Sequence, residues 1–204
     1  MGIPVLIVGE SGSGKTYSIK NLDPKGVGIF SVEKNRLPFK NSGFKVMKNA
    51  KYGDIFGGLK RSTDMKTFVI DDSQYLLVNE MFDRARETGY GKYTDMAVNF
   101  RGLIHAINHD LPDDVIVYFL HHSEYDNTSG RYKAKTIGKM IDQYLTVEGC
   151  FDIVLFTYRD NEGYHFVTQS DGTTTAKSPE GMFDLKIPND LKIVTDKIRE
   201  YYFD

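Results

Sequence analysis

The sequence has one cysteine, no long apolar run and almost no net charge, and each shortage excludes a class of protein. Cys150 has no partner for an internal disulfide, so the reducing cytoplasm is the expected setting. No stretch is long and apolar enough for a transmembrane helix. The apolar start, Met1 to Val8, lacks the basic residues of a signal peptide. We therefore expect a soluble protein that does not contact membranes.

The formal net charge of −2 gives the whole chain no general affinity for nucleic acid. The charge is nevertheless uneven along the sequence. Residues 1–66 hold 12 Lys and Arg against 5 Asp and Glu, whereas the remainder holds 14 against 23. Two interpretations stay open, namely a basic face for a polyanion and surface lysines that only maintain solubility.

A segment rich in glycine and serine follows the apolar start, and it reads Gly9-Glu10-Ser11-Gly12-Ser13-Gly14-Lys15-Thr16. Its Gly-x-x-x-x-Gly-Lys-Thr spacing is that of a phosphate-binding loop, in which successive backbone N–H groups point at the β-phosphate. Lys15 is predicted to contact the β- and γ-phosphates, and the Thr16 hydroxyl to bind Mg²⁺. We expect ATP with Mg²⁺ as the ligand and residues Gly9 to Tyr17 as its binding segment.

Two carboxylates follow predicted strands. Asp71 ends the apolar segment Phe68 to Ile70 and is predicted to hold Mg²⁺ through water, as a Walker B aspartate does. Asp72 is expected to orient water, to cap the next helix, or both. Glu33 ends the strand expected beside the phosphate loop and is the candidate for aligning or deprotonating the attacking water. A surface pairing of Glu33 with neighbouring cations is the plainer alternative.

Strand and helix patterns alternate along the chain, which predicts an α/β sandwich with a mostly parallel sheet. Strands are expected at 4–8, 27–32, 44–47, 67–70 and 115–120, and helices at 15–21, 52–61, 73–86, 94–109, 136–145 and 189–202. The turn-forming segment 160–163 predicts a hairpin between 151–158 and 164–169. In the last helix, Leu191, Val194, Ile198 and either Tyr201 or Tyr202 are expected to face inward. No linker divides the sequence, so one domain is expected.

Missing motifs narrow the subclass. The Asn-Lys-x-Asp segment with which GTPases read guanine does not occur in the sequence. AAA+ ATPases and helicases usually carry Asp-Glu at the second motif, where this chain has Asp71-Asp72. Small-molecule kinases typically have an arginine-rich lid. The candidate lid segment here, 123–136, has a single arginine, Arg131, so a kinase is disfavoured. A glutamate on the second strand, here Glu33, is the arrangement of RecA-type ATPases.

Several segments together resemble a family of bacteriophage ATP-binding proteins. They are the phosphate loop, Phe68 to Asp72, His121 to Glu124, Lys135 to Lys139 and Asp171 to Pro179. That family is RecA-like and similar to the Sak-type phage recombination ATPases, which are associated with single-strand annealing and single-stranded DNA binding. The resemblance covers Pro4 to about Tyr202. Residues 73–109 do not match the RecA core and are expected to be an insertion within a single domain, 1–204.

The resemblance implies roles at the nucleotide. It places Lys15, Thr16 and Asp71 at nucleotide and metal, and Glu33 at the catalytic glutamate position. His121 falls where RecA-like proteins keep a polar residue that senses the γ-phosphate, with His122 as the alternative. Two surface histidines with no such role are the plainer interpretation.

The resemblance also suggests where DNA and a second subunit bind. The segment Glu124 to Lys135 occupies the position of a DNA-binding loop, and its candidates for stacking and phosphate contacts are Tyr125, Arg131, Tyr132, Lys133 and Lys135. An ordinary solvated loop is the alternative. Lys177, or its rival Arg159, is a candidate for reaching the γ-phosphate of an adjacent subunit. A lysine without such a partner is equally consistent with the sequence.

The favoured hypothesis is a phage ATPase in the host cytoplasm that couples Mg²⁺-ATP to single-stranded DNA binding in recombination or annealing. It predicts self-association as a ring or filament, and phage or host replication and recombination proteins are open as partners. A nucleotide or small-metabolite kinase is one alternative. A non-catalytic ATP-dependent adaptor for phage replication proteins is the other.

Overall fold

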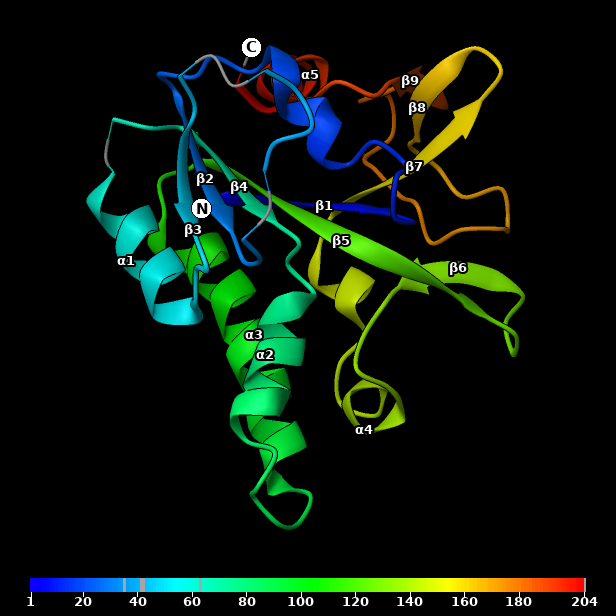
Figure 1. The fold of residues 1–204 in the computed structure, drawn as a ribbon. Helices are drawn as coiled ribbons and strands as arrows, with labels where there is room; N and C mark the ends of the chain where they lie inside the picture. The colour runs from blue at the N-terminus through cyan, green and yellow to red at the C-terminus, as the bar shows by residue number, and fades with distance from the viewer. Residues whose placement is uncertain (35, 41–42, 63, 204) are drawn as a thin grey trace.

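A sheet of nine strands with helices on both faces forms the fold in the computed structural model, which describes residues 1–34, 36–40, 43–62 and 64–203 (Figure 1). The strands are β1 (Ile3–Gly9), β2 (Val27–Ser31), β3 (Lys45–Lys48), β4 (Thr67–Asp71), β5 (Ile116–Asp126), β6 (Arg131–Ala134), β7 (Ile153–Asp160), β8 (Gly163–Val167) and β9 (Lys186–Pro188). The architecture is the predicted α/β sandwich, in which a mostly parallel sheet lies between two layers of helices.

The order of strands across the sheet is β3-β2-β4-β5-β1-β7-β8-β9, with β6 paired to β5. The first six of these strands pair in parallel, and β8 and β6 add antiparallel hairpins. Strand β1 pairs with β5 along one edge and with β7 along the other. The expectation that the strand before Glu33 lies beside the phosphate loop is therefore wrong, because β4 and β5 separate β2 from β1. The strand of Asp71 is likewise one strand removed from β1.

Two apolar cores lie on opposite faces of the sheet, because side chains alternate between the faces along each strand. Leu6 and Val8 of β1 point into one core, and Val5 and Ile7 point into the other. The first core lies under α1 (Tyr52–Arg61), α2 (Tyr75–Asp83), α3 (Gly91–Asp110) and α4 (Lys139–Asp142). The second lies under α5 (Leu191–Phe203) and the 3₁₀ helix η1 (Thr16–Asn21), on the other side of the sheet in Figure 1.

Three helix predictions need correction. The helix after the phosphate loop is the 3₁₀ helix η1, whose buried Ser18 N–H lies within hydrogen-bond distance of both the Gly14 and Lys15 carbonyls. The helix expected at 136–145 is reduced to the four residues of α4, and the 3₁₀ helix η2 (Val147–Cys150) follows it. In α5, Leu191, Val194 and Ile198 are buried as expected. Tyr201 and Tyr202 are instead 45% and 43% exposed, because the helix extends past the edge of its core.

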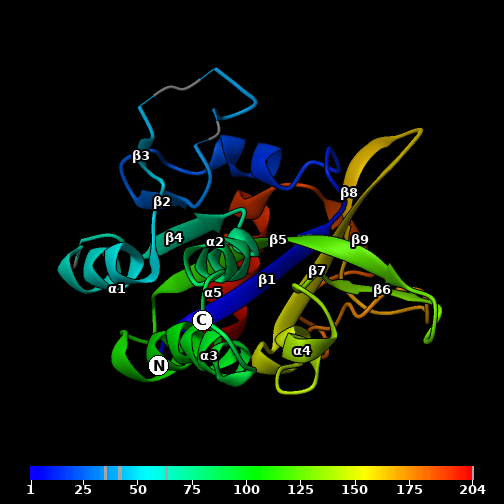
Figure 2. The ribbon, with the colours of Figure 1, turned by 60° about the horizontal axis from the view of Figure 1, so that its bottom comes forward.

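The segment expected to be a DNA-binding loop is a β-hairpin. Strand β5 continues beyond the sheet to Asp126 and turns back into β6, so that Tyr125 lies opposite Tyr132 and Glu124 lies opposite Lys133. Figure 2 shows this hairpin extending from the body of the molecule beside the loop that precedes β9. A backbone hydrogen bond of 2.8 Å from Tyr132 N–H to the Thr173 carbonyl joins the two segments.

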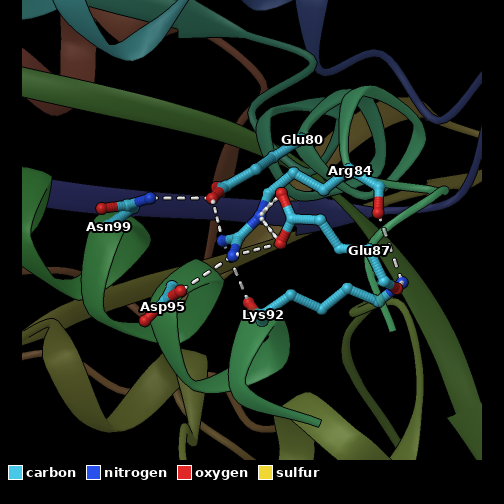
Figure 3. Close-up of polar contacts among 6 residues, drawn as sticks. All are labelled: Glu80, Arg84, Glu87, Lys92, Asp95 and Asn99. Atoms are coloured by element: carbon cyan, nitrogen blue, oxygen red, sulfur yellow. Dashed lines mark hydrogen bonds and ion pairs between the residues drawn. The ribbon is translucent and has the colours of Figure 1, made fainter. Parts of the chain in front are cut away.

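The helical hairpin α2–α3 connects β4 to β5 and covers residues 73–109. Its tip is held by Arg84, whose guanidinium pairs with Glu80, Glu87 and Asp95 at 3.4, 2.7 and 2.8 Å (Figure 3). These contacts join the end of α2 to the start of α3 across the turn. In the described part of the chain, no helix has both the length and the hydropathy needed to span a membrane.

Candidate functional site

A cavity of about 920 Å³ lies at the carboxyl ends of the parallel strands. This edge of a parallel α/β sheet is where such folds bind their ligands. The phosphate loop forms one wall, and side chains that follow β2, end β4 or belong to β5 and β8 complete the lining. The lining includes Ser11, Gly12, Gly14, Lys15, Thr16, Tyr17, Glu33, Arg36, Asp71, Asp72, Tyr75, His122 and Tyr164.

The phosphate loop has the backbone that its glycines permit. Gly12 and Gly14 have φ values of 78° and 98°, a region that residues with a side chain rarely adopt. At Gly9 the constraint is space, because a Cβ there would lie 1.9 Å from the Thr157 hydroxyl oxygen of β7. The Thr157 hydroxyl also hydrogen-bonds the Ser13 hydroxyl. Strand β7 therefore packs against the phosphate loop and supports it. No motif in the sequence predicts this contact.

Lys15 is buried, and its ammonium donates to the carbonyl oxygens of Gly9 and Glu10, each at 2.8 Å. Burial lowers the pKa of Lys15 to about 8, against the opposing attraction of Asp72 and Asp71. The cation is thus held inside the loop by neutral carbonyl groups. A phosphate group entering the loop would provide a stronger, charged acceptor for the same ammonium.

Thr16 and Asp71, both predicted at the metal, lie side by side. The Thr16 hydroxyl donates to Asp71 Oδ1 at 2.9 Å, although 55 residues separate them in the chain. Burial, and after it the charge of the neighbouring Asp72, raise the pKa of Asp71 to about 6. A hydroxyl and a buried carboxylate are oxygen donors of the kind that Mg²⁺ prefers. These two residues therefore fit the cation that accompanies a nucleotide.

Glu33 and Asp72 bring further carboxylates to the cavity. Glu33 lines it despite the distance of β2 from β1, and its Oε1 accepts a 3.2 Å hydrogen bond from Asn79 of α2. Asp72 has a φ of 60°, a left-handed backbone that aspartate tolerates better than most residues. His122 Nε2 lies 3.3 Å from Asp72 Oδ1. Either Glu33 or Asp72 offers a base for water at this site.

His121 does not line the cavity, and His122 does. The His121 ring is fully buried, with Nε2 donating to the Lys135 carbonyl at 2.7 Å and Nδ1 lying 2.9 Å from the Ser73 hydroxyl. Burial lowers the pKa of His121 to about 4, so the ring is neutral. The expectation that His121 contacts the γ-phosphate is corrected for this reason. Of the two histidines, the one with access to a ligand is His122.

The candidate DNA-binding residues divide between the two faces of the β5–β6 hairpin, because side chains alternate along a strand. Tyr125 and Tyr132 share one face, and their ring centroids are 5.1 Å apart. Arg131 and Lys133 belong to the other, where Lys133 pairs with Glu124 at 3.4 Å and with Asp142 at 3.1 Å. Lys135 follows the hairpin and is exposed. The sequence did not show this separation of rings from cations.

Among the residues that the structure describes, Lys177 is not part of the cavity lining. Its backbone N–H and carbonyl pair with Val154 of β7 at 2.9 and 2.8 Å, and its residue is exposed. The guanidinium of its rival, Arg159, lies 5.3 Å from the ring centroid of Tyr164. Within the described part of the chain, Tyr164 lines the cavity and Arg159 does not. A role for Lys177 or Arg159 at an adjacent subunit stays a prediction.

Comparison with known proteins identifies related sequences and folds. A family model, AAA_24, described as an AAA domain, matches residues 1–180. The second motif, Asp71-Asp72, therefore does not set the chain apart from AAA domains. No curated protein matches the sequence.

Among solved structures, 63 chains match. One of them, a DnaB-like replicative helicase described with its interactions with primase, has a TM-score of 0.55 and 14% sequence identity. The match covers 88% of this chain and 54% of the helicase chain, so this chain spans about half the length of that protein. At this identity the likeness concerns the fold alone.

Proposed function

Because the chain belongs to the AAA_24 family of AAA domains, we propose that it hydrolyses Mg²⁺-ATP and couples the nucleotide to binding of single-stranded DNA. The family match and the helicase-like fold support ATP binding and hydrolysis in general terms. The observation that carries the proposal is the 2.9 Å contact between Thr16 and Asp71 beside the buried Lys15, at the mouth of a cavity large enough for a nucleotide.

In the proposed reaction the charged and polar side chains named here have separate tasks. Lys15 leaves the carbonyl groups of Gly9 and Glu10 for the β- and γ-phosphates, and Thr16 and Asp71 are the residues that would hold Mg²⁺. The metal would neutralise charge that develops on the phosphates. Glu33 orients the attacking water and accepts its proton, and His122 contacts the γ-phosphate beside Asp72.

Single-stranded DNA is the proposed effector. The Tyr125–Tyr132 face of the β5–β6 hairpin offers rings on which bases can stack, and Tyr125 is 51% exposed. Arg131 and Lys135 are exposed cations for phosphates near the same hairpin. His121 links this hairpin to the residues after Asp71, since its ring bonds both the Lys135 carbonyl and Ser73. A change at the nucleotide thus has a short, packed route to the hairpin.

We further propose, from the resemblance to phage recombination ATPases, that the chain acts as one domain within a ring or filament during recombination or annealing. The solved helicase with a similar fold is described as a replicative helicase that interacts with primase. Lys177, exposed on the far side of β7, is then the candidate cation for the nucleotide of an adjacent subunit.

Steady-state ATP hydrolysis with Mg²⁺, with and without single-stranded DNA, tests the proposal. Lys15→Ala serves as the blank, and Tyr125→Ala as the variant that removes a stacking ring without touching the cavity. We expect DNA to stimulate the wild type, Tyr125→Ala to lose the stimulation but keep basal turnover, and Lys15→Ala to lose both.

Turnover that ignores DNA, together with no retention of DNA by the ATP-bound protein, contradicts the coupling. Hydrolysis that survives in Lys15→Ala contradicts the nucleotide site itself.

A further inference from the structure

Two tyrosine rings lie side by side at one end of the cavity. Tyr17 follows Thr16 in the chain, whereas Tyr164 comes from β8, yet both line the cavity with ring centroids 6.4 Å apart and an interplanar angle of 34°. Tyr17 is 40% exposed and Tyr164 is 36% exposed. Exposed aromatic faces in a concave site are suited to stacking on a flat ligand.

Both rings are held by cations. Lys20 donates to the Tyr17 hydroxyl at 3.0 Å and lies 5.1 Å from the centre of that ring. Arg159 lies 5.3 Å from the centre of the Tyr164 ring. Cations over aromatic rings are attracted to their negative faces, so both rings have a preferred position.

Asn189, just before α5, lies next to Tyr164 and the phosphate loop. Its backbone N–H points to the Tyr164 carbonyl at 3.3 Å, and a Cβ built on Gly14 would lie 3.3 Å from its Nδ2 and 2.8 Å from the Tyr164 ring. The position of this segment is fixed by Asp190, which accepts a 2.7 Å hydrogen bond from Asn21 of η1.

The side-chain amide of Asn189 is unsatisfied. Both its Oδ1 and its Nδ2 are buried, and neither has a hydrogen-bond partner among the residues that the structure describes. Buried polar atoms are nearly always paired. A donor and an acceptor without partners, next to two residues that line the cavity, Gly14 and Tyr164, therefore indicate a polar edge that a ligand would supply.

We propose that Tyr17, Tyr164 and Asn189 form the base subsite of the nucleotide site, where the base stacks on the tyrosines and Asn189 reads its edge. The inference rests on the proposed function, because it requires the phosphates of the same nucleotide at Lys15. Asn189 lies outside residues 1–180, the part matched by the AAA_24 family. The subsite therefore depends on a segment of this chain that the family match does not cover.

The chemistry of Asn189 selects adenine. At the N7 edge of the base, an asparagine amide presents one donor group and one acceptor, which match N7 and the N6 amino group of adenine. The same edge of guanine presents two acceptors, N7 and O6, one of which would face the Asn189 carbonyl oxygen. Stacking on Tyr17 and Tyr164 does not distinguish the two bases, since every base has an aromatic face.

Calorimetric titration with non-hydrolysable ATP and GTP analogues in Mg²⁺ tests the subsite. We expect the wild type to bind the ATP analogue about tenfold more tightly, the scale of one bidentate amide–base contact. Asn189→Ala is expected to weaken ATP binding until the two analogues bind equally. Asn189→Asp, which has no donor when ionised, is expected to weaken ATP binding and to bring no gain in GTP binding, because the guanine edge presents acceptors alone.

Two further variants separate the contributions of the site. Tyr164→Leu is expected to weaken both analogues to the same extent, by about tenfold, because it removes stacking alone. Asn161→Ala changes an exposed asparagine in the turn between β7 and β8, the strand of Tyr164, and is expected to keep the wild-type affinities. If Asn189→Ala does not fold, Asn189→Asp and Tyr164→Leu carry the test.

Equal affinities of the wild type for the two analogues, or a preference that survives in folded Asn189→Ala, overturn the base subsite and leave the phosphate site standing. Binding of neither analogue, or binding unchanged by Lys15→Ala, overturns the proposed function and the subsite together.

Discussion

The phosphate-loop edge of the sheet and the tip of α2–α3 each gather charged side chains, and the two groups differ in burial. At the sheet edge, Lys15 and Asp71 are 6% and 3% exposed. At the tip, Arg84 meets Glu87 and Asp95, whose side chains are 50% and 62% exposed (Figure 3). Lys15 and Asp71 are withdrawn from water, whereas Glu87 and Asp95 at the tip stay exposed around a half-buried Arg84.

The pKa values record this difference. Burial disfavours the charged form of both Lys15 and Asp71, moving their pKa values to about 8 and about 6. At the tip, hydrogen bonds from Arg84 lower the pKa of Glu87, so its charge is favoured. Ionisable groups that a fold holds against their preferred charge occur mostly at functional sites, whereas exposed ion pairs contribute little to stability.

The largest expected effect is that of Asp71→Asn. Asparagine keeps an acceptor for the Thr16 hydroxyl but removes the anionic oxygen from the proposed Mg²⁺ site. We expect Mg²⁺-dependent ATP hydrolysis to fall by a factor on the order of 10³, equivalent to several kcal/mol of lost charge stabilisation. Thermal unfolding is expected to stay near the wild-type midpoint. A variant with full turnover would show that the buried carboxylate at the sheet edge is structural.

Glu33→Gln is expected to have the next largest effect. The amide retains the size of the side chain but cannot accept a proton, so turnover should fall about 100-fold or more, as for loss of a general base. Binding of the ATP analogue should be unchanged. Asp72→Asn is the matched variant, because Asp72 is the other carboxylate available for the same task. If Asp72→Asn stops hydrolysis and Glu33→Gln does not, the base is assigned to the wrong strand.

His121 gives a smaller effect, on stability. Its pKa is lowered from 6.5 to about 4 in the folded protein, chiefly by burial. Between these values the unfolded chain binds more protons than the folded one, so the free energy of unfolding falls as pH drops from 6.5 towards 4. The full contribution is about 3 kcal/mol, at roughly 1.4 kcal/mol per pH unit. It is intact above pH 6.5.

Urea unfolding at several pH values in this window measures the effect. His121→Gln is expected to be less stable at neutral pH but to show a flatter dependence on pH. His105→Gln, which changes an exposed histidine of α3, should keep the wild-type slope. Equal slopes for His121→Gln and the wild type would show that the buried ring does not control acid sensitivity.

The smallest expected effect is that of Arg84→Met at the tip of α2–α3. The substitution removes the pairs with the exposed Glu87 and Asp95, and surface pairs of this kind have little net value. It also removes the pair with the less exposed Glu80, which keeps a hydrogen bond from Asn99. We expect unchanged ATP hydrolysis and faster hydrogen exchange confined to the turn between α2 and α3. A large loss of turnover would mean that the tip takes part in the reaction and would remove the contrast with the sheet edge.

The candidate site was predicted from the sequence where its residues are local. The glycines, Lys15 and Thr16 follow one another in a spacing that only a phosphate loop explains, and Asp71 follows a continuous apolar strand. The core of the last helix was also predictable, since Leu191, Val194 and Ile198 repeat at helical spacing. Tyr201 and Tyr202 continue the same pattern, but whether it is buried depends on how far the sheet reaches.

Other parts of the site depend on which strands become neighbours. The insertion of β5 between β1 and β4 corrected the expected position of Glu33, and the extension of β5 into a hairpin turned an expected loop into two faces. The choice between His121 and His122 was also made by side-chain alternation along β5. The His121 ring points into the core beneath α3, and the His122 ring points towards the cavity. Two consecutive histidines in the sequence do not reveal which of them faces the cavity.

The sequence by itself determined the phosphate loop, the carboxylate that faces it and the alternation of strands and helices, because each depends on neighbouring residues and on backbone preferences. Only the tertiary structure decided that Thr157 supports the loop, that Tyr164 and Asn189 reach it, and that rings and cations separate on the β5–β6 hairpin. These contacts join residues up to 175 positions apart, such as Gly14 and Asn189. They follow from the order of strands in the sheet, which no local pattern in the chain encodes.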